Sequence, residues 1–184
     1  MTGEKINPSG VTAIWGGRGS GKTTLARSFL KQLAAQRIMV IDPMAGEGFT
    51  TARDFAQALY DGERRLTLAT GDPGEAIPAL YAAWAHSTKS APIYAICDEA
   101  PAYLDKPTPG LNRIMFQGRH RAFGMCLIGQ RIAAVSAQIR SQAETSFFLR
   151  LTDHVDLETA RKVIGPENAA KLPQFAPGDY IRHP

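Results

Sequence analysis

The stretch Gly16-Gly17-Arg18-Gly19-Ser20-Gly21-Lys22-Thr23 decides the fold of this chain. It matches the Walker A pattern G-x-x-x-x-G-K-[ST], in which a glycine-rich loop holds the phosphates of a nucleotide. The apolar run at residues 11–15 predicts a buried strand before it, and residues 24–35 predict an amphipathic helix after it. Because strand, loop and helix in this order are the context in which the pattern binds phosphate, we interpret the stretch as a phosphate-binding loop.

The residue types of the loop suit that chemistry. Phosphate oxygens need several N–H donors close together, and glycines let the backbone turn tightly and approach them. The start of the following helix adds unpaired N–H groups and the positive end of the helix dipole. We predict that Lys22 binds the β- and γ-phosphates of ATP and that the Thr23 hydroxyl holds Mg²⁺. The predicted nucleotide-binding residues are Gly16, Gly17, Arg18, Gly19, Ser20, Gly21, Lys22, Thr23 and Thr24. The alternative interpretation is a glycine-rich turn without a ligand.

A second stretch, Ile93-Tyr94-Ala95-Ile96-Cys97-Asp98-Glu99, ends an apolar strand in two adjacent carboxylates. Beside a phosphate loop, Asp98 is expected to hold the Mg²⁺ through water, and Glu99 is expected to polarise the water that attacks the γ-phosphate. The alternative is a buried strand that ends in a solvated turn. Residues 123–131 predict another strand with a polar end, which would bring Gln130 level with Asp98 if the two strands were neighbours. The predicted catalytic residues are therefore Glu99, Gln130 and Lys22.

Composition narrows the class of protein. The chain has 184 residues, of which 44% are hydrophobic and 21% charged, as is typical of a soluble globular domain. It lacks both a signal-peptide pattern and an apolar run of about 18 residues, so we expect a cytoplasmic protein without a transmembrane segment. A net charge of +4 permits a polyanionic partner but indicates one only weakly. Cys97 and Cys126 lie in apolar runs and fit no zinc pattern, which predicts reduced core residues.

Predicted strands alternate with predicted helices along the whole chain. This alternation is typical of an α/β domain with a mainly parallel sheet covered by helices on both faces. One domain over residues 1–184 accounts for the pattern. We expect a flexible N-terminus over residues 1–9 and a C-terminal turn and short strand over residues 173–184.

With these pieces placed, the chain resembles the HerA/FtsK superfamily of DNA-pumping ATPases. It is most similar to the small genome-packaging ATPases of membrane-containing phages. The resemblance covers residues 11–180 and implies a three-layer P-loop NTPase fold of the RecA/ASCE kind. Besides the loop and Cys97-Asp98-Glu99, it rests on Ile41-Asp42-Pro43 with Glu47, Gly118-Arg119-His120-Arg121, Gln130-Arg131, Arg150-Leu151-Thr152 and Pro177-Gly178-Asp179-Tyr180.

The resemblance implies an oligomeric ring, usually a hexamer, that hydrolyses ATP to move double-stranded DNA. In such a ring an arginine of one subunit reaches the ATP of the next and stabilises charge in the transition state. The candidates for this finger are Arg119, Arg140 and Arg150, while Arg131 could act within its own subunit. A viral capsid or membrane-vertex protein is an implied docking partner, which would place the chain in the host cytoplasm or the virion.

The segment 100–110 is rich in proline and glycine and predicts a loop in which Tyr103 and Lys106 are exposed. In a ring, this loop would lie near the central pore, where Lys106 would contact the DNA backbone without reading its sequence.

Other functions fit parts of the pattern. A related motor could extrude single-stranded phage DNA or drive conjugative transfer. A non-motor adaptor could use its ATP state to recruit a partner. A small-molecule kinase fits less well, because such kinases usually carry an arginine-rich lid and lack the paired Asp-Glu at this strand end.

Overall fold

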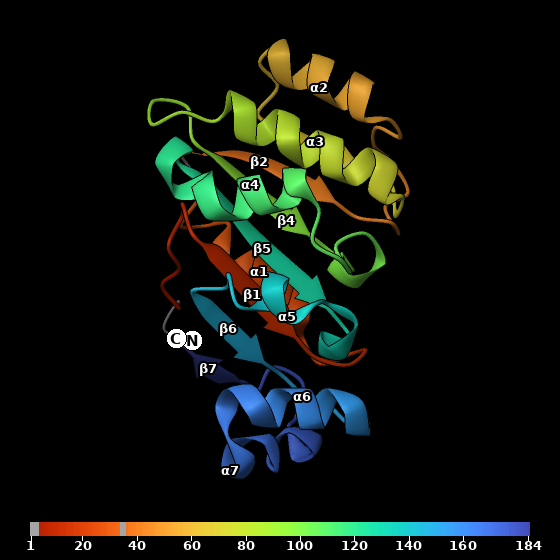
Figure 1. The fold of residues 1–184 in the computed structure, drawn as a ribbon, viewed down its shortest axis with the longest axis vertical. Coiled ribbons are helices and arrows are strands. Elements are labelled where there is room, and N and C mark those ends of the chain that lie inside the picture. The colour runs from red at the N-terminus through yellow and green to blue at the C-terminus, as the bar shows by residue number, and fades with distance from the viewer. Residues whose placement is uncertain (1–3, 34–35) are drawn as a thin grey trace.

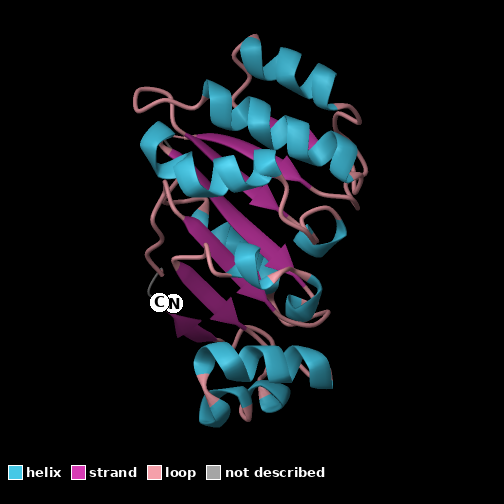
Figure 2. Ribbon diagram, viewed as in Figure 1, coloured by secondary structure: helices cyan, strands magenta, loops and turns pink. Residues whose placement is uncertain are grey.

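The computed structural model describes residues 4–33 and 36–184 and is built around one sheet of seven strands (Figures 1 and 2). The strands are β1 (Val11–Trp15), β2 (Arg37–Ile41), β3 (Arg65–Leu68), β4 (Ile93–Cys97), β5 (Phe123–Gly129), β6 (Thr145–Phe148) and β7 (Ile181–His183). Their order across the sheet is β3-β2-β4-β5-β1-β6-β7. Neighbouring strands run parallel except β6 and β7, which are antiparallel.

Helices connect the parallel strands, as the alternating pattern predicts. They are α1 (Lys22–Phe29), α2 (Ala52–Tyr60), α3 (Pro73–His86), α4 (Pro109–Gln117), α5 (Ala137–Arg140), α6 (His154–Ile164) and α7 (Pro166–Ala169). Short 3₁₀ turns are η1 (Ala100–Ala102), η2 (Gly118–Arg121), η3 (Ile132–Ala134) and η4 (Leu172–Gln174). Polar residues fix the helix starts: the Asp72 carboxylate accepts from Gly74 N at 2.9 Å, and Pro73 takes the first helical position of α3.

Helices cover both faces of the sheet. Leu25 and Phe29 of α1 pack in one apolar cluster with Ile14 of β1 and Phe147 of β6. The opposite face carries α2, α3, α4 and α6, whose apolar side chains form the other cluster (Figure 1). This arrangement buries strands from both sides, which explains why β1, β4 and β5 consist of unbroken apolar runs rather than alternating ones.

The strand order has one consequence for the site. β5 lies between β4, which ends in the acidic pair, and β1, which leads into the phosphate loop. The carboxyl ends of parallel strands meet at one edge of the sheet. Gln130, directly after β5, therefore lies between the acidic pair that ends β4 and the phosphate loop that follows β1. β4 and β5 are neighbours, and Cys97 pairs with Leu127 in their register. Gln130 therefore lies two residues beyond the position level with Asp98, in contrast to the sequence-based expectation.

Several boundaries and exposures differ from the sequence-based expectation. α1 ends at Phe29, because residues 30–33 continue in turns; residues 34 and 35 of the predicted helix lie outside the described part of the chain. Tyr103 is fully buried rather than exposed, since its ring fills the apolar cluster and its hydroxyl finds backbone partners there. Lys106 is exposed as predicted, with 84% of its side chain accessible.

The described part of the N-terminus is tied to the C-terminal strand. Glu4 accepts a hydrogen bond from the Tyr180 hydroxyl at 2.8 Å and pairs with the Arg182 guanidinium at 3.1 Å. Ile6 is buried in the cluster beneath α1. Glu4 and Ile6 therefore contact the domain, while the flexibility expected for residues 1–9 stays a prediction; residues 1–3 are not described.

Two properties expected from composition are visible in the described residues. Cys97 and Cys126 are free, fully buried thiols, and burial raises the pKa of Cys97 to about 12. Both are therefore core residues rather than reactive groups. No helix in the described ranges is long and apolar enough to cross a membrane.

Candidate active site

The phosphate loop is anchored to segments far away in the sequence. Gly16 N donates to Gly129 O of β5 at 3.2 Å, and Gly17 N donates to Arg150 O at 2.7 Å. On its outer side, Gly178 N donates to Ser20 O at 2.9 Å. The loop conformation is therefore fixed by β5, by the end of β6 and by the C-terminal turn before any ligand binds.

Two loop positions require glycine for different reasons. Gly21 has a φ of 100°, and a Cβ there would lie 3.1 Å from Gly178 N, so an L side chain would be both strained and crowded. At Gly16 a Cβ would come within 2.6 Å of the Ser20 hydroxyl and 2.8 Å of Leu149 Cβ. The glycines of the pattern thus permit this close packing as well as the approach of a phosphate.

Lys22 is buried at the start of α1, and its ammonium donates to Gly17 O at 3.0 Å across the loop. Burial lowers the pKa of Lys22, while the carboxylates of Glu99 and Asp98 oppose this shift. A buried ammonium is further stabilised by an anion placed against it. The polyphosphate of a nucleotide would supply that charge within the loop.

A cavity of about 380 Å³ borders the loop and is lined by Gly19, Gly21, Lys22, Thr23, Thr24 and Pro177. A second cavity of about 210 Å³ is lined by Thr23 on one side and by Asp42 and Asp98 on the other. Thr23 thus belongs to both spaces. Thr23 of the loop and Asp98 of the acidic strand end therefore border the same space.

Two residues that line the second cavity, Thr23 and Asp98, fit a magnesium ion. Mg²⁺ prefers oxygen ligands and is usually held by one or two protein groups together with phosphates and waters. The Thr23 hydroxyl and the Asp98 carboxylate are such groups and border one space. The described residues contain no cluster of three His, Cys, Asp or Glu side chains that could hold a metal without a nucleotide.

Asp98 is held by its backbone and by its neighbour. Its N–H donates to Ile41 O of β2 at 2.8 Å, and its carboxylate accepts from Glu99 N at 3.0 Å. Burial raises the pKa of Asp98; Asp42 and Glu99 also raise it, while the bond from Glu99 N and the charge of Lys22 oppose the shift. This carboxylate is therefore destabilised when ionised without a cation beside it.

Tyr103 supports the acidic strand end, and the sequence analysis missed this role. Its hydroxyl donates to Asp98 O at 2.9 Å, with Ile41 O at 3.3 Å as a second acceptor. Tyr103 therefore ties η1 to the ends of β2 and β4. The available signal was a tyrosine five residues after Asp98, because a ring with a polar tip suits a buried site with free carbonyls.

Glu99 and Gln130 are brought together at the carboxyl edge of the sheet. The amide Nε2 of Gln130 donates to Oε1 of Glu99. Glu99 has a φ of 47°, in the left-handed region that a glutamate rarely adopts. Such strain is typical of functional sites, where the surroundings hold a side chain in one position.

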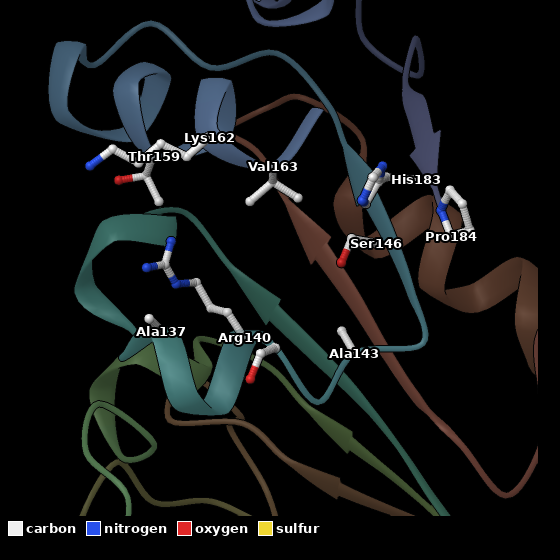
Figure 3. Close-up of a pocket in the computed structure, with 10 residues that line it drawn as sticks. Ala137, Arg140, Ala143, Ser146, Thr159, Lys162, Val163, His183 and Pro184 are labelled. Carbon is white, nitrogen blue, oxygen red and sulfur yellow. The ribbon is translucent and has the colours of Figure 1, made fainter. Parts of the chain in front are cut away.

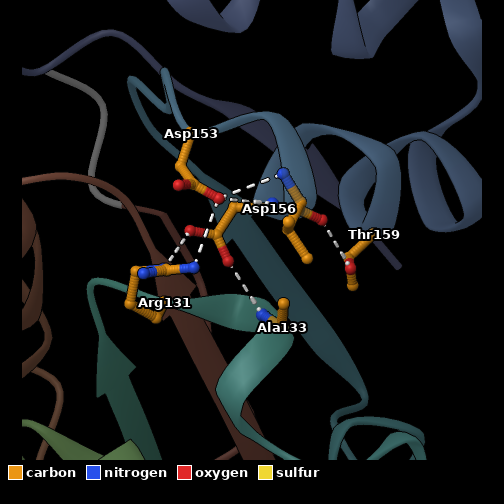
Figure 4. Close-up of polar contacts among 6 residues, drawn as sticks. Arg131, Ala133, Asp153, Asp156 and Thr159 are labelled. Atoms are coloured by element: carbon orange, nitrogen blue, oxygen red, sulfur yellow. Dashed lines mark hydrogen bonds and ion pairs between the residues drawn. The ribbon is translucent and has the colours of Figure 1, made fainter.

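The four arginines singled out by the sequence lie in different places. Arg119 is exposed in η2, at the amino end of β5 and away from the loop. Arg140, at the end of α5, lines a cavity with Ser146 of β6 and Thr159 of α6, to which no residue of the phosphate loop belongs. Arg150 contacts its own loop through Nη2, 3.5 Å from Arg18 O. Arg131 forms ion pairs with Asp156 at 2.7 Å and Asp153 at 3.3 Å (Figure 4).

Fold and site together define a P-loop nucleotide hydrolase domain. A family model described as an AAA domain matches residues 6–134, a segment that holds the phosphate loop, the acidic pair and Gln130. The chain therefore belongs to the AAA domain family and is a P-loop ATPase. No curated protein sequence matches it.

Solved structures share the fold over most of the chain. The genome packaging NTPase B204 from Sulfolobus turreted icosahedral virus 2, in complex with ATP-gammaS, is similar with a TM-score of 0.80 and 20% identity, covering 97% of this chain and 93% of that one. B204, the DNA-packaging ATPase from Sulfolobus turreted icosahedral virus, gives a TM-score of 0.77 at 20% identity, with coverages of 96% and 93%. The RadB recombinase gives 0.51 at 17% identity, with coverages of 82% and 79%. These matches confirm the predicted P-loop fold, which the chain shares with the viral packaging NTPase B204 over most of its length.

Proposed function

We propose that this ATPase packages a viral genome, acting as a ring of subunits on double-stranded DNA. The observation that carries the proposal is the similarity in fold to the B204 packaging NTPase over 97% of the chain, at a TM-score of 0.80. The active-site geometry supports hydrolysis, and the exposed Lys106 on the loop after Glu99 supports contact with a polyanion.

The residues have distinct parts in the proposed reaction. Backbone N–H groups of the loop bind the phosphates, and Lys22 exchanges its bond to Gly17 O for a phosphate oxygen. Thr23 and Asp98 would hold the Mg²⁺, which neutralises phosphate charge when bound. Glu99 accepts a proton from the attacking water, and Gln130 orients its carboxylate.

The ring would supply the group that a single subunit lacks. Arg119 and Arg140 lie away from their own loop, so each could reach only the nucleotide of a neighbour. Arg150 already contacts its own loop and would have to leave it to act on a neighbour. Docking of the ring on a capsid or membrane-vertex protein completes the proposal.

The test is the ATPase rate per subunit as a function of protein concentration, with and without double-stranded DNA. We expect a rate that rises with concentration and again with duplex, because ring assembly adds the finger and DNA engages the pore. A flat response to both would contradict the motor and favour a nucleotide-gated adaptor. Greater stimulation by single-stranded DNA would favour an extrusion motor instead.

A substitution of Glu99 tests the hydrolysis step separately from ring assembly. Glu99→Gln keeps the side-chain size but cannot accept the proton, so turnover should fall by about 10² to 10⁴ while ATP binding is retained. Glu167→Gln, at an exposed position of α7, is the matched control and should leave turnover unchanged. Hydrolysis that survives in Glu99→Gln would rule out the proposed base.

A further inference from the structure

A cavity of about 450 Å³ lies between α5 and α6, away from the phosphate loop (Figure 3). Two cationic side chains line it, Arg140 of α5 and Lys162 of α6, together with His183 of β7. Three hydroxyl groups, from Ser141, Ser146 and Thr159, complete its polar lining. The remaining lining is small and apolar, and no carboxylate side chain belongs to it.

This cavity and the phosphate loop are separate sites. Ser146 is level with Ala13 in the register of β6 and β1, whereas the loop begins only after Trp15. The neighbouring residue Phe147 packs against Phe29 of α1, with ring centroids 5.5 Å apart. Since side chains alternate along a strand, Ser146 faces the other side of the sheet from α1. The cavity therefore opens on the sheet face opposite the helix that follows the loop.

Arg140 is the unusual group of the cavity. Its Nε is buried and has no hydrogen-bond partner in the described part of the chain. Burial also lowers the pKa of Arg140, with no carboxylate to oppose the shift. Arg121 differs, because its Nε donates to Trp84 O at 3.0 Å. A partly buried guanidinium without a partner is costly, and an anion would remove that cost.

The nearest acidic residue in the sequence does not serve as that partner. Glu144 follows the turn after α5, but its carboxylate accepts from Asn7 Nδ2 at 2.8 Å. In Figure 3 the Arg140 side chain extends from α5 towards Thr159 of α6. The positive charge is thus aimed into the space between the two helices.

We propose that this cavity binds a phosphate group, as a monoester or a diester, independently of the phosphate loop. Guanidinium and ammonium groups are donors that proteins use for phosphate oxygens, and Arg offers a planar fork that matches them. The Ser146 hydroxyl is a further donor, whereas the Ser141 and Thr159 hydroxyls already donate to Gln138 O and Val155 O. A space of about 450 Å³ is also within the usual range of small-ligand sites. The phosphate could come from a free nucleotide or sugar phosphate, or from the backbone of DNA.

The test is a calorimetric titration with pyrophosphate on protein that carries one molar equivalent of a non-hydrolysable ATP analogue in its phosphate loop, with no excess nucleotide present. We expect one additional binding event, and slower hydrogen exchange over residues 137–146 and 159–163 when pyrophosphate is present. Arg140→Gln should weaken this binding about tenfold, because it removes a charge-assisted contact. Lys162→Gln should weaken it as well, and its exposed position makes a folding defect no concern.

Arg161→Gln is the matched control. Like Lys162→Gln, it removes one positive charge from α6. Arg161, however, pairs with Glu158 at 3.5 Å and lines a different cavity. The control should leave pyrophosphate binding unchanged. No additional binding event, or equal losses in the Arg140 and Arg161 variants, would overturn the proposal.

The source of the phosphate is decided by competition. If a short duplex displaces pyrophosphate in the wild type but not in Arg140→Gln, the site takes backbone phosphates. If the duplex leaves pyrophosphate bound and free nucleotides displace it, the site takes a small phosphate ester. These outcomes do not depend on ATP turnover, so they can be told apart from a failure of the packaging proposal.

Discussion

The side-chain amide of Gln130 donates a hydrogen bond to Oε1 of Glu99, across the gap between the ends of β5 and β4. The bond exists because β5 is inserted between the acidic strand and the strand that enters the phosphate loop. Glu99 also has a φ of 47°, so a strained backbone and a neutral amide together fix its carboxylate. The position of the proposed base is therefore set before ATP binds.

That strain can be measured by replacing Glu99 with glycine. A left-handed conformation costs an L residue roughly 1–2 kcal/mol, and the larger entropy of an unfolded glycine offsets about half of the gain. We expect Glu99→Gly to unfold about 2 °C above the wild type in a thermal melt, with ATP turnover lost. The variant would then be more stable and inactive.

Ala122→Gly is the matched control, because Ala122 has a φ of 53° and lies before β5, away from the loop. It should gain a similar amount of stability and keep its turnover. If Glu99→Gly melts below the wild type while Ala122→Gly melts above it, the contact to Gln130 outweighs the strain.

Asp98→Asn should stabilise the nucleotide-free protein. Burial raises the pKa of Asp98 in the folded state, so its ionised form opposes folding. The penalty is absent below the ordinary aspartate pKa of 3.8, grows as pH rises above it, and is complete above the raised pKa of Asp98 in the folded protein. We therefore expect the melting temperature of the variant to exceed that of the wild type by a margin that widens from pH 4 to pH 7.

Magnesium should reverse this order. With ATP analogue and Mg²⁺ present, the wild type should gain stability and Asp98→Asn should gain much less, because the carboxylate then has its cation. Asp61→Asn, at the exposed end of α2, gives the baseline effect of removing a carboxylate. Equal stabilisation of wild type and Asp98→Asn by Mg²⁺ would contradict a magnesium role for Asp98.

Tyr103→Phe removes only the hydroxyl that holds the backbone of Asp98. Loss of one buried hydrogen bond should lower the free energy of unfolding by about 1 kcal/mol. Since Asp98 then loses an anchor, the Mg²⁺ concentration needed for half-maximal ATPase rate should rise severalfold. Tyr60→Phe is the control, because Tyr60 is 73% exposed and lies on α2. A variant that is less stable but needs no more Mg²⁺ would make Tyr103 purely structural.

Local sequence patterns predicted the helices and strands, and the strand ends at which the candidate site residues lie. Apolar runs bounded by polar or glycine residues place β1 and β4 at their observed bounds, and the Asp72-Pro73 pair marks the start of α3. The phosphate loop is legible because its glycines and its lysine occur at fixed spacing. These signals are local, so a single sequence contains them.

The relationships between elements were less accessible. Strand order depends on pairing between distant segments, and no residue of β5 indicates by itself that this strand lies between β4 and β1. The burial of Tyr103 depends on carbonyls of β2 and β4 that only the folded sheet brings together. The positive φ of Glu99 breaks the usual preference of glutamate, as expected where function opposes local propensity. In the proposed ring, the choice of arginine finger would depend on a second subunit.

The last prediction concerns Arg131, which directly follows Gln130 and ties the end of β5 to α6. Its Nε donates to Asp156, a carboxylate that is only 1% exposed and also accepts from Ala133 N at 2.9 Å (Figure 4). Arg131→Met would leave that carboxylate buried without its cation, which we expect to cost about 2 kcal/mol, less than for a fully buried pair because Arg131 is half exposed.

The exposed pair of Arg161 with Glu158 on the same helix provides the comparison, since Arg161→Met should change stability by about 0.5 kcal/mol or less. Adding Asp156→Asn to Arg131→Met should recover part of the loss, because no unpaired charge then remains in the interior. Chemical denaturation of the three variants measures all of these terms. Equal losses in Arg131→Met and Arg161→Met would mean that the hydrogen bond from Ala133 N already satisfies Asp156, and that Arg131 is free to act elsewhere in the site.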